Sequence, residues 1–142
     1  PDTCSKLTDN MHEFSHIRAR ILQENSFQWL SEHVDDFPPD HRRLVLIDPP
    51  YEPYETYMAW SLKLIQQLHD GWPNSCLILW YPYLDDLQID GLYQRLAFLD
   101  TQDILVAEFG LAETDSLETS GLLLIRAPPG TDSKLEVLLS SL

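Results

Sequence analysis

Residues 44–52 read Leu-Val-Leu-Ile-Asp-Pro-Pro-Tyr-Glu, and the fold that we expect for this chain follows from this stretch. Four consecutive apolar residues, two of them β-branched, are typical of a strand that is buried on both faces, so we predict a strand over Leu44–Asp48. Pro49 and Pro50 have no backbone N–H and therefore end the pairing. Asp48 is thus predicted at the carboxyl end of a parallel strand, where open α/β sheets bind their ligands.

The composition is that of one globular domain with an acidic surface. A chain of 142 residues can build one core, and its net charge of −14 argues against an extended nucleic-acid footprint, although acidic residues also simply aid solubility. Cys4 and Cys76 match no metal-ligand spacing and favour a reducing compartment. We find neither an apolar run of the ~20 residues that span a bilayer nor a signal-peptide pattern, and we therefore predict a soluble, cytoplasmic protein.

Helical and strand patterns alternate along the chain, which predicts an α/β fold with a mostly parallel sheet. The last two strands are separated only by a polar loop, so we expect an antiparallel hairpin at one edge of the sheet. The helices are predicted over residues 11–18, 26–34, 54–70, 84–99 and 134–142, and the strands over residues 18–23, 44–48, 75–80, 103–109 and 120–127.

The end of the strand at Asp48 has a specific chemical capability. Because Pro50 has no N–H, the carbonyl of Pro49 stays free, and it can accept a hydrogen of a planar amino group together with the Asp48 carboxylate. Tyr51 offers an aromatic ring that can stack on a nucleobase, provided that the base is single-stranded or leaves its stack. This arrangement suits methyl transfer to an exocyclic base nitrogen, with the rate coming from positioning and electrostatics.

A structural explanation of the same residues stays open. An aspartate before proline is a common turn. The pairs Pro38-Pro39 and Pro128-Pro129 occur elsewhere in this chain, so paired prolines are not diagnostic here. The aromatic residues Trp80, Tyr81 and Tyr83 either form a wall of a base pocket or only pack against the sheet.

Further segments, taken in order, carry a resemblance to a known family. Residues 42–52 end in Asp-Pro-Pro-Tyr-Glu, residues 79–82 read Leu-Trp-Tyr-Pro, and residues 119–129 run from Thr-Ser-Gly-Leu to Pro-Pro. Together they resemble the bacterial 23S ribosomal RNA adenine-N6 methyltransferases over about residues 19–142. The resemblance implies a Rossmann-like class I methyltransferase fold, S-adenosylmethionine as the methyl donor, and an adenine in ribosomal RNA as the acceptor.

The resemblance also implies roles for individual residues. Those implied for the chemistry are Asp48, Pro49 and Tyr51; for the donor site Asn25, Ser26 and Asp48; and for substrate binding Pro50, Tyr51, Tyr81 and Ser120. Asn25-Ser26 stands where the family commonly has Asp-Gly. Ser120 and Gly121 resemble a small-residue turn, which either admits the substrate closely or only makes a tight entry into the last strand. No metal site is implied.

One part of the family pattern is missing from these residues. No glycine-containing donor loop precedes residue 19, since the first of the five glycines is Gly71. We therefore expect residues 1–142 to form a single domain that corresponds to the carboxyl-terminal half of such an enzyme, without its first strands. A sheet that ends beside a central strand exposes a hydrophobic edge, so we expect self-association unless something covers that edge.

Two alternatives to an RNA adenine methyltransferase remain. One is methylation of adenine in DNA, or of an amino group of guanine or cytosine. The other is a non-catalytic binding module that has a degenerate methyltransferase fold, which the missing glycine loop, Asn25-Ser26 and the acidic charge favour.

Overall fold

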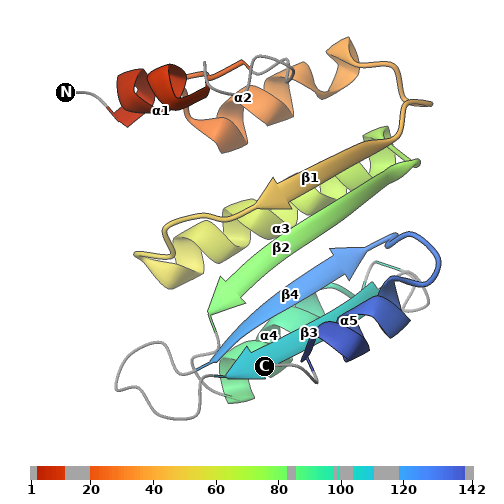
Figure 1. Ribbon diagram of the computed structural model, residues 1–142. Coiled ribbons are helices and arrows are strands. Elements are labelled where there is room, and N and C mark those ends of the chain that lie inside the picture. Colours follow the sequence, from red (N-terminus) through yellow and green to blue (C-terminus); the bar gives the residue numbers. More distant parts are fainter. Residues whose placement is uncertain are drawn as a thin grey trace.

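A computed structural model describes residues 3–11, 20–82, 86–97, 99, 104–110 and 119–139 as an α/β fold, which confirms the predicted fold class (Figure 1). The helices and strands alternate along most of the described chain. Their bounds are α1 Thr3–Met11, α2 Ser26–His33, the 3₁₀ turn η2 Val34–Asp36, β1 Arg43–Ile47, α3 Tyr54–Gly71, β2 Ser75–Pro82, α4 Asp86–Arg95, β3 Ile104–Gly110, β4 Thr119–Ile125 and α5 Thr131–Leu139.

The four described strands form one mixed sheet in the order β1-β2-β4-β3. β1 lies parallel to β2, with a register that runs from Arg43 opposite Ser75 to Ile47 opposite Leu79. β4 lies antiparallel to both β2 and β3, so the expected antiparallel hairpin is present at one edge. The described sheet therefore contains one parallel and two antiparallel pairings, and β1 and β3 form its edges.

One face of this sheet carries the core. Side chains alternate between the two faces of a strand, and α3 and α4 lie behind the sheet in Figure 1, over the face that includes Ile47 and Leu79. The buried apolar cluster combines this face with both helices: Ile47, Leu77, Leu79, Tyr81, Leu123 and Ile125 come from the strands, and Met58, Leu62, Ile65, Leu68, Ile89 and Leu92 from the helices. The predicted helical stripe of residues 54–70 is therefore confirmed as the main cover of the sheet.

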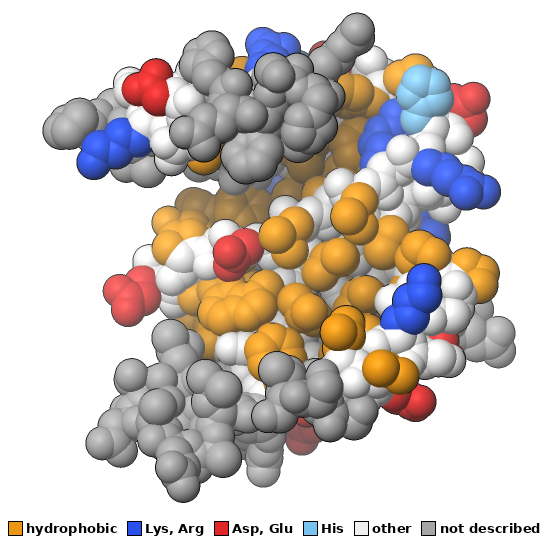
Figure 2. All heavy atoms as spheres, in the orientation of Figure 1, with side chains coloured by type: hydrophobic (Ala, Val, Ile, Leu, Met, Phe, Trp, Pro, Cys, Tyr) orange, Lys and Arg blue, Asp and Glu red, His pale blue; other side chains and the backbone are white. Residues whose placement is uncertain are grey.

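The other face of β1 is open, so the prediction of a strand buried on both faces is wrong. Leu44 and Leu46 are 70% and 62% exposed, whereas Ile47 is only 5% exposed. The physical reason is that β1 is an edge strand, and that α5 contacts the sheet at β3, which is the edge opposite β1 (Figure 1). Figure 2 shows hydrophobic side chains gathered over the strands on this face.

The amino end of α2 follows the expected capping chemistry. Asn25 is the N-cap, and its Oδ1 accepts a hydrogen bond of 3.1 Å from the backbone N–H of Gln28. The helix then packs against α3, where the Ser31 hydroxyl donates to Gln67 over 2.6 Å. The predicted helix over residues 26–34 is confirmed, and this packing brings it near the free edge of β1.

The amino-terminal predictions were less successful. Residues 20–23 are irregular, so the strand predicted over residues 18–23 is absent from the described part of that range; residues 18 and 19 lie outside the described residues. A strand needs a neighbour, and none of the four described strands pairs with this segment. The helix predicted over residues 11–18 lies outside the described residues except for Met11, which ends α1. We did not expect α1, because its sequence is polar on average.

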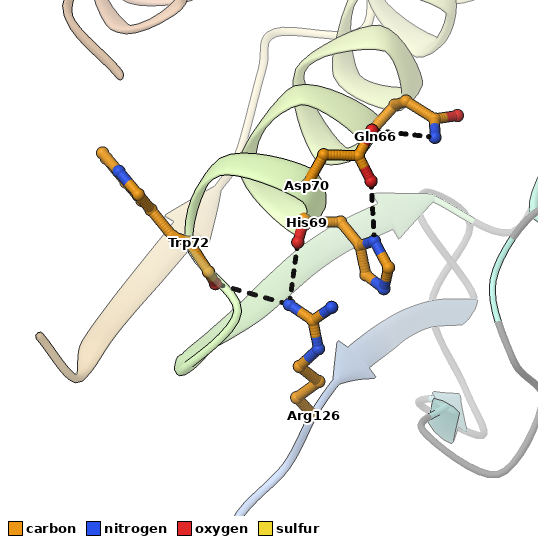
Figure 3. A network of polar contacts seen from close by, with 5 residues as sticks. All are labelled: Gln66, His69, Asp70, Trp72 and Arg126. Atoms are coloured by element: carbon orange, nitrogen blue, oxygen red, sulfur yellow. Dashed lines mark hydrogen bonds and ion pairs between the residues drawn. The ribbon is translucent and has the colours of Figure 1, made fainter. Parts of the chain in front are cut away.

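The carboxyl end of α3 is closed by a residue that follows β4, an inner strand of the sheet (Figure 3). Arg126, just after β4, donates through Nη1 to the carbonyl oxygens of His69, at 3.1 Å, and Trp72, at 3.3 Å. The bond to His69 satisfies an acceptor that the end of a helix leaves without a partner, whereas the Trp72 carbonyl also accepts from the backbone N–H of Ser75. Beside them, hydrogen bonds from His69 and Gln66 lower the pKa of the Asp70 carboxyl.

Within the described residues, no helix combines the length and the apolar character that crossing a membrane requires.

Candidate functional site

The site predicted from the sequence lies at the exit from β1. Asp48 follows the last paired residue of the strand and is exposed, as is Pro50, whereas Pro49 between them is buried. Tyr51 is only 7% exposed and adopts a left-handed backbone conformation, with φ of 56°. The chain thus leaves the strand in a tight turn, and the Asp48 carboxylate is accessible at the carboxyl end of β1, as we predicted.

A pocket of about 210 Å³ opens between α2 and β1, next to this turn. Asp48 and Pro49 line it together with Ser26, which begins α2. Two residues that the sequence predicted for the donor site, Ser26 and Asp48, are therefore neighbours of the same cavity although they lie far apart in the chain. The rest of the lining is apolar: Phe27, Leu30, Val45, Leu46, Ile47 and Leu64.

Sequence reasoning missed most of this apolar lining. Phe27, Leu30 and Leu64 lie on the stripes that pack α2 and α3 together, and such stripes are the ordinary signal of a core. Only the knowledge that α2 packs beside an edge strand turns the same side chains into the wall of a pocket.

Asn25 does not line this pocket. Its side-chain oxygen caps α2, and the residue borders a separate pocket of about 350 Å³ together with Gln28, Trp60 and Lys63. Its predicted contact with the methyl donor stays a prediction, and the structure gives this side chain a structural task at the helix end.

Tyr51 turns inward. Its hydroxyl donates a hydrogen bond to the carbonyl oxygen of Trp80 on β2, and its ring lies against Tyr54 and Trp80, with ring centroids 5.9 and 5.6 Å away. Burial, followed by the nearby Tyr54 and Asp48, raises the pKa of the Tyr51 phenol, which therefore stays neutral. Base stacking by Tyr51 stays a prediction, and it requires a face of this ring to be freed from its present contacts.

Tyr81 is fully buried and points away from β1, across β4. Its hydroxyl donates to Glu108 Oε1 on β3 over 2.9 Å, and the Tyr93 hydroxyl donates to the same oxygen over 3.1 Å. Gly121 lies directly beneath the ring, because a Cβ at this position would come within 2.1 Å of Tyr81 Cζ. The predicted role of Tyr81 in substrate binding stays a prediction, whereas the space that Gly121 leaves for this ring is a third explanation for the glycine.

The remaining predicted residues are close to the same end of the sheet. Ser120 on β4 is half-buried and lies opposite Pro82, the last residue of β2. Trp80 is also half-buried, so part of its surface remains accessible. Tyr83 lies outside the described residues. Ser120 therefore stays a candidate for substrate contact.

The family model described as "Ribosomal RNA large subunit methyltransferase D, RlmJ" matches residues 1–142, which is the whole chain. The chain belongs to the RlmJ family. The resemblance found in the sequence is thereby confirmed.

Curated relatives agree with this membership in the RlmJ family. The chain is 32% identical over 115 residues to "Ribosomal RNA large subunit methyltransferase J" of Escherichia coli, an alignment that covers 78% of this chain and 40% of the relative. It is 27% identical over 137 residues to the protein of the same name from Haemophilus influenzae, covering 94% of this chain and 47% of the relative. The chain thus spans less than half the length of these two RlmJ relatives.

The fold also matches a crystal structure of a Legionella pneumophila protein assigned to the family DUF519. The TM-score is 0.69 at 20% identity, and the match covers 83% of this chain and 43% of that chain. This likeness supports the α/β arrangement of the described strands and helices, and it shows the same arrangement as part of a longer chain in that structure.

Proposed function

We propose that this chain carries the chemistry of a ribosomal RNA methyltransferase that depends on S-adenosylmethionine and acts on N6 of adenine. The observation that supports this most directly is that Asp48 and Pro49 line one pocket together with Ser26, at the carboxyl end of a parallel strand. Membership in the RlmJ family supports the same reaction class. A ribosomal RNA substrate also agrees with the cytoplasmic location that we predicted.

The proposed mechanism uses the oxygen atoms of two adjacent residues. The Asp48 carboxylate and the Pro49 carbonyl each accept a hydrogen from the amino group of the target base, which turns the nitrogen lone pair out of the plane of the ring. S-adenosylmethionine, when bound, supplies an activated methyl group. The amino nitrogen would take this methyl group with loss of the carbon–sulfur bond of the donor, and its surplus proton would leave to water. Asp48 stabilises the positive charge that develops on nitrogen.

The residues of the pocket fit part of such a donor. The Ser26 hydroxyl and the Asp48 carboxylate offer polar contacts, and the side chains of Phe27, Leu30 and Leu64 offer an apolar wall for a nucleobase. The cavity of about 210 Å³ is smaller than the roughly 300–1,000 Å³ of complete small-molecule sites. We therefore assign only one portion of the donor to these residues.

The proposal is tested by removing the carboxylate. Asp48→Ala and Asp48→Asn should lower transfer of a labelled methyl group to 23S ribosomal RNA by at least about 10²-fold, because a preorganised charge next to the reacting nitrogen is lost. Digestion of the product to nucleosides should place the label on N6-methyladenosine. Label on another nucleoside, or equally good transfer to DNA, would instead support one of the alternative amino substrates.

The matched control is Asp90→Asn, which neutralises an exposed carboxylate on α4. It should leave transfer unchanged. Full activity in Asp48→Ala would contradict the proposed role of this residue.

A non-catalytic binding module is the second candidate. The small pocket beside Asp48 favours it. Calorimetric titration of the chain with S-adenosylhomocysteine distinguishes the two candidates. Measurable binding that Asp48→Ala weakens supports the enzyme, whereas no binding and no methyl transfer support the module.

A further inference from the structure

The turn after β1 is linked to β2 by a side chain and not by the backbone. The parallel register between these strands ends at Ile47 opposite Leu79. Beyond that pair, Pro49 and Pro50 have no N–H with which to continue it. The next contact across the two strands is made by the Tyr51 hydroxyl, which donates to the carbonyl oxygen of Trp80. Asp48 and Pro49 therefore lie between two connections to β2: the last register pair, Ile47 opposite Leu79, and the hydrogen bond from the Tyr51 hydroxyl.

The backbone conformation of Tyr51 indicates that its side-chain contacts hold the turn in place. A residue with a side chain is disfavoured at φ of 56°, where glycine is usually found, and such conformations persist when their surroundings determine them. Here the determining contacts are the ring packing on Tyr54 and Trp80 and the buried hydroxyl bond. The same contacts leave only 7% of the residue exposed, so in this structure Tyr51 offers little surface to a base.

We propose that Tyr51 is a positioning residue, whose hydroxyl bond to the Trp80 carbonyl fixes the orientation of the Asp48–Pro49 turn for methyl transfer. The catalytic consequence rests on the proposed function, whereas the structural link does not. Positioning by the hydroxyl and stacking by the ring can be separated by substitution, because phenylalanine keeps an aromatic face for stacking and loses only the hydroxyl.

The link itself is tested by hydrogen exchange, which requires neither donor nor RNA. In the 142-residue chain, Tyr51→Phe should raise exchange about fivefold at the amides of Tyr51 and Glu52 and at those of β2 next to Trp80, which corresponds to the loss of one hydrogen bond. The matched control is Tyr57→Phe, because Tyr57 lies on α3 with its ring against Phe27 and Trp60. Unchanged exchange in Tyr51→Phe would overturn the proposal.

The rate of methyl transfer tests the catalytic consequence of this positioning. Tyr51→Phe should lower kcat for methyl transfer about tenfold or more while KM for the RNA stays unchanged, because misplacement of reacting groups slows chemistry without weakening binding. Tyr51→Leu should be at least as slow. A Tyr51→Phe variant with normal kcat, beside a Tyr51→Leu variant that is defective, would overturn positioning in favour of stacking. If the wild-type chain transfers no methyl group, the proposed function fails, and the exchange result alone decides whether Tyr51 holds the turn.

Discussion

The two faces of the sheet differ most at β1, where neighbouring residues of the same chemical type have opposite environments. Ile47 is 5% exposed and faces the layer that includes α3, whereas Leu46 is 62% exposed on the opposite face. The apolar character of the strand is thus equal on both sides, and only the placement of the helices distinguishes them. An apolar run predicts a strand, but the cover over each face depends on elements that are far away in the sequence.

The largest loss of folding stability is expected for a substitution on the covered face of the sheet. Leu79→Ala should destabilise the fold by about 3 kcal/mol, because Leu79 is completely buried and its truncation leaves a cavity beneath α3. Urea unfolding followed by circular dichroism measures this loss. A destabilisation below about 1 kcal/mol would mean that the two faces are less different than the structure indicates.

An intermediate effect is expected at Tyr81, on the same covered face. Tyr81→Phe should cost about 1 kcal/mol at neutral pH, because its hydroxyl bond to Glu108 is lost. Burial, together with the bonds to Tyr93 and Glu108, raises the pKa of the Tyr81 phenol above its ordinary value of 10.0. Below pH 10 the folded and unfolded phenols are both protonated, and this contribution is complete; above it only the unfolded phenol ionises, so stability falls as the pH rises.

Urea unfolding at neutral pH and above pH 10 tests this dependence. The loss of stability with rising pH should be smaller in Tyr81→Phe than in the wild type. Tyr57→Phe, with a half-buried ring on α3, serves as the control and should follow the wild type. Identical pH profiles for Tyr81→Phe and the wild type would contradict the buried, neutral phenol.

The smallest effect on stability is expected on the open face. Leu46→Lys should change the free energy of unfolding by no more than about 0.5 kcal/mol, since the side chain is already mostly in water. It should also raise the monomer fraction at high concentration, because a lysine on an edge strand opposes association. Light scattering coupled to size-exclusion chromatography measures the mass. A wild-type chain that remains monomeric at high concentration would contradict the self-association predicted from the sequence.

Local signals were sufficient for most elements and for the neighbourhood of Asp48. The apolar run before Asp48 identified β1, the stripe after Tyr51 identified α3, and Asn25 marked the start of α2. The prediction that a carboxylate is accessible at the carboxyl end of β1 therefore followed from local signals.

What the sequence could not provide depends on contacts between distant residues. The exposure of Leu44 follows from the strand order, and the pocket beside Asp48 follows from the packing of α2 against α3. The inward turn of Tyr51 needs an acceptor on β2, which lies 29 positions later. The strand expected over residues 18–23 was wrong for a related reason, because a strand is defined by its neighbour and not by its own side chains.

The contact of Arg126 with the end of α3 has a consequence for the order in which this protein is assembled during translation. The carbonyl groups of His69 and Trp72 receive their donor from a residue that is synthesised 57 and 54 positions later. Until β4 has emerged from the ribosome and reached the sheet, the carbonyl oxygen of His69 lacks this donor, whereas that of Trp72 keeps its bond to the backbone N–H of Ser75. The hydrogen bonding at the carboxyl end of the longest described helix is therefore completed only after the last of the described strands is in place.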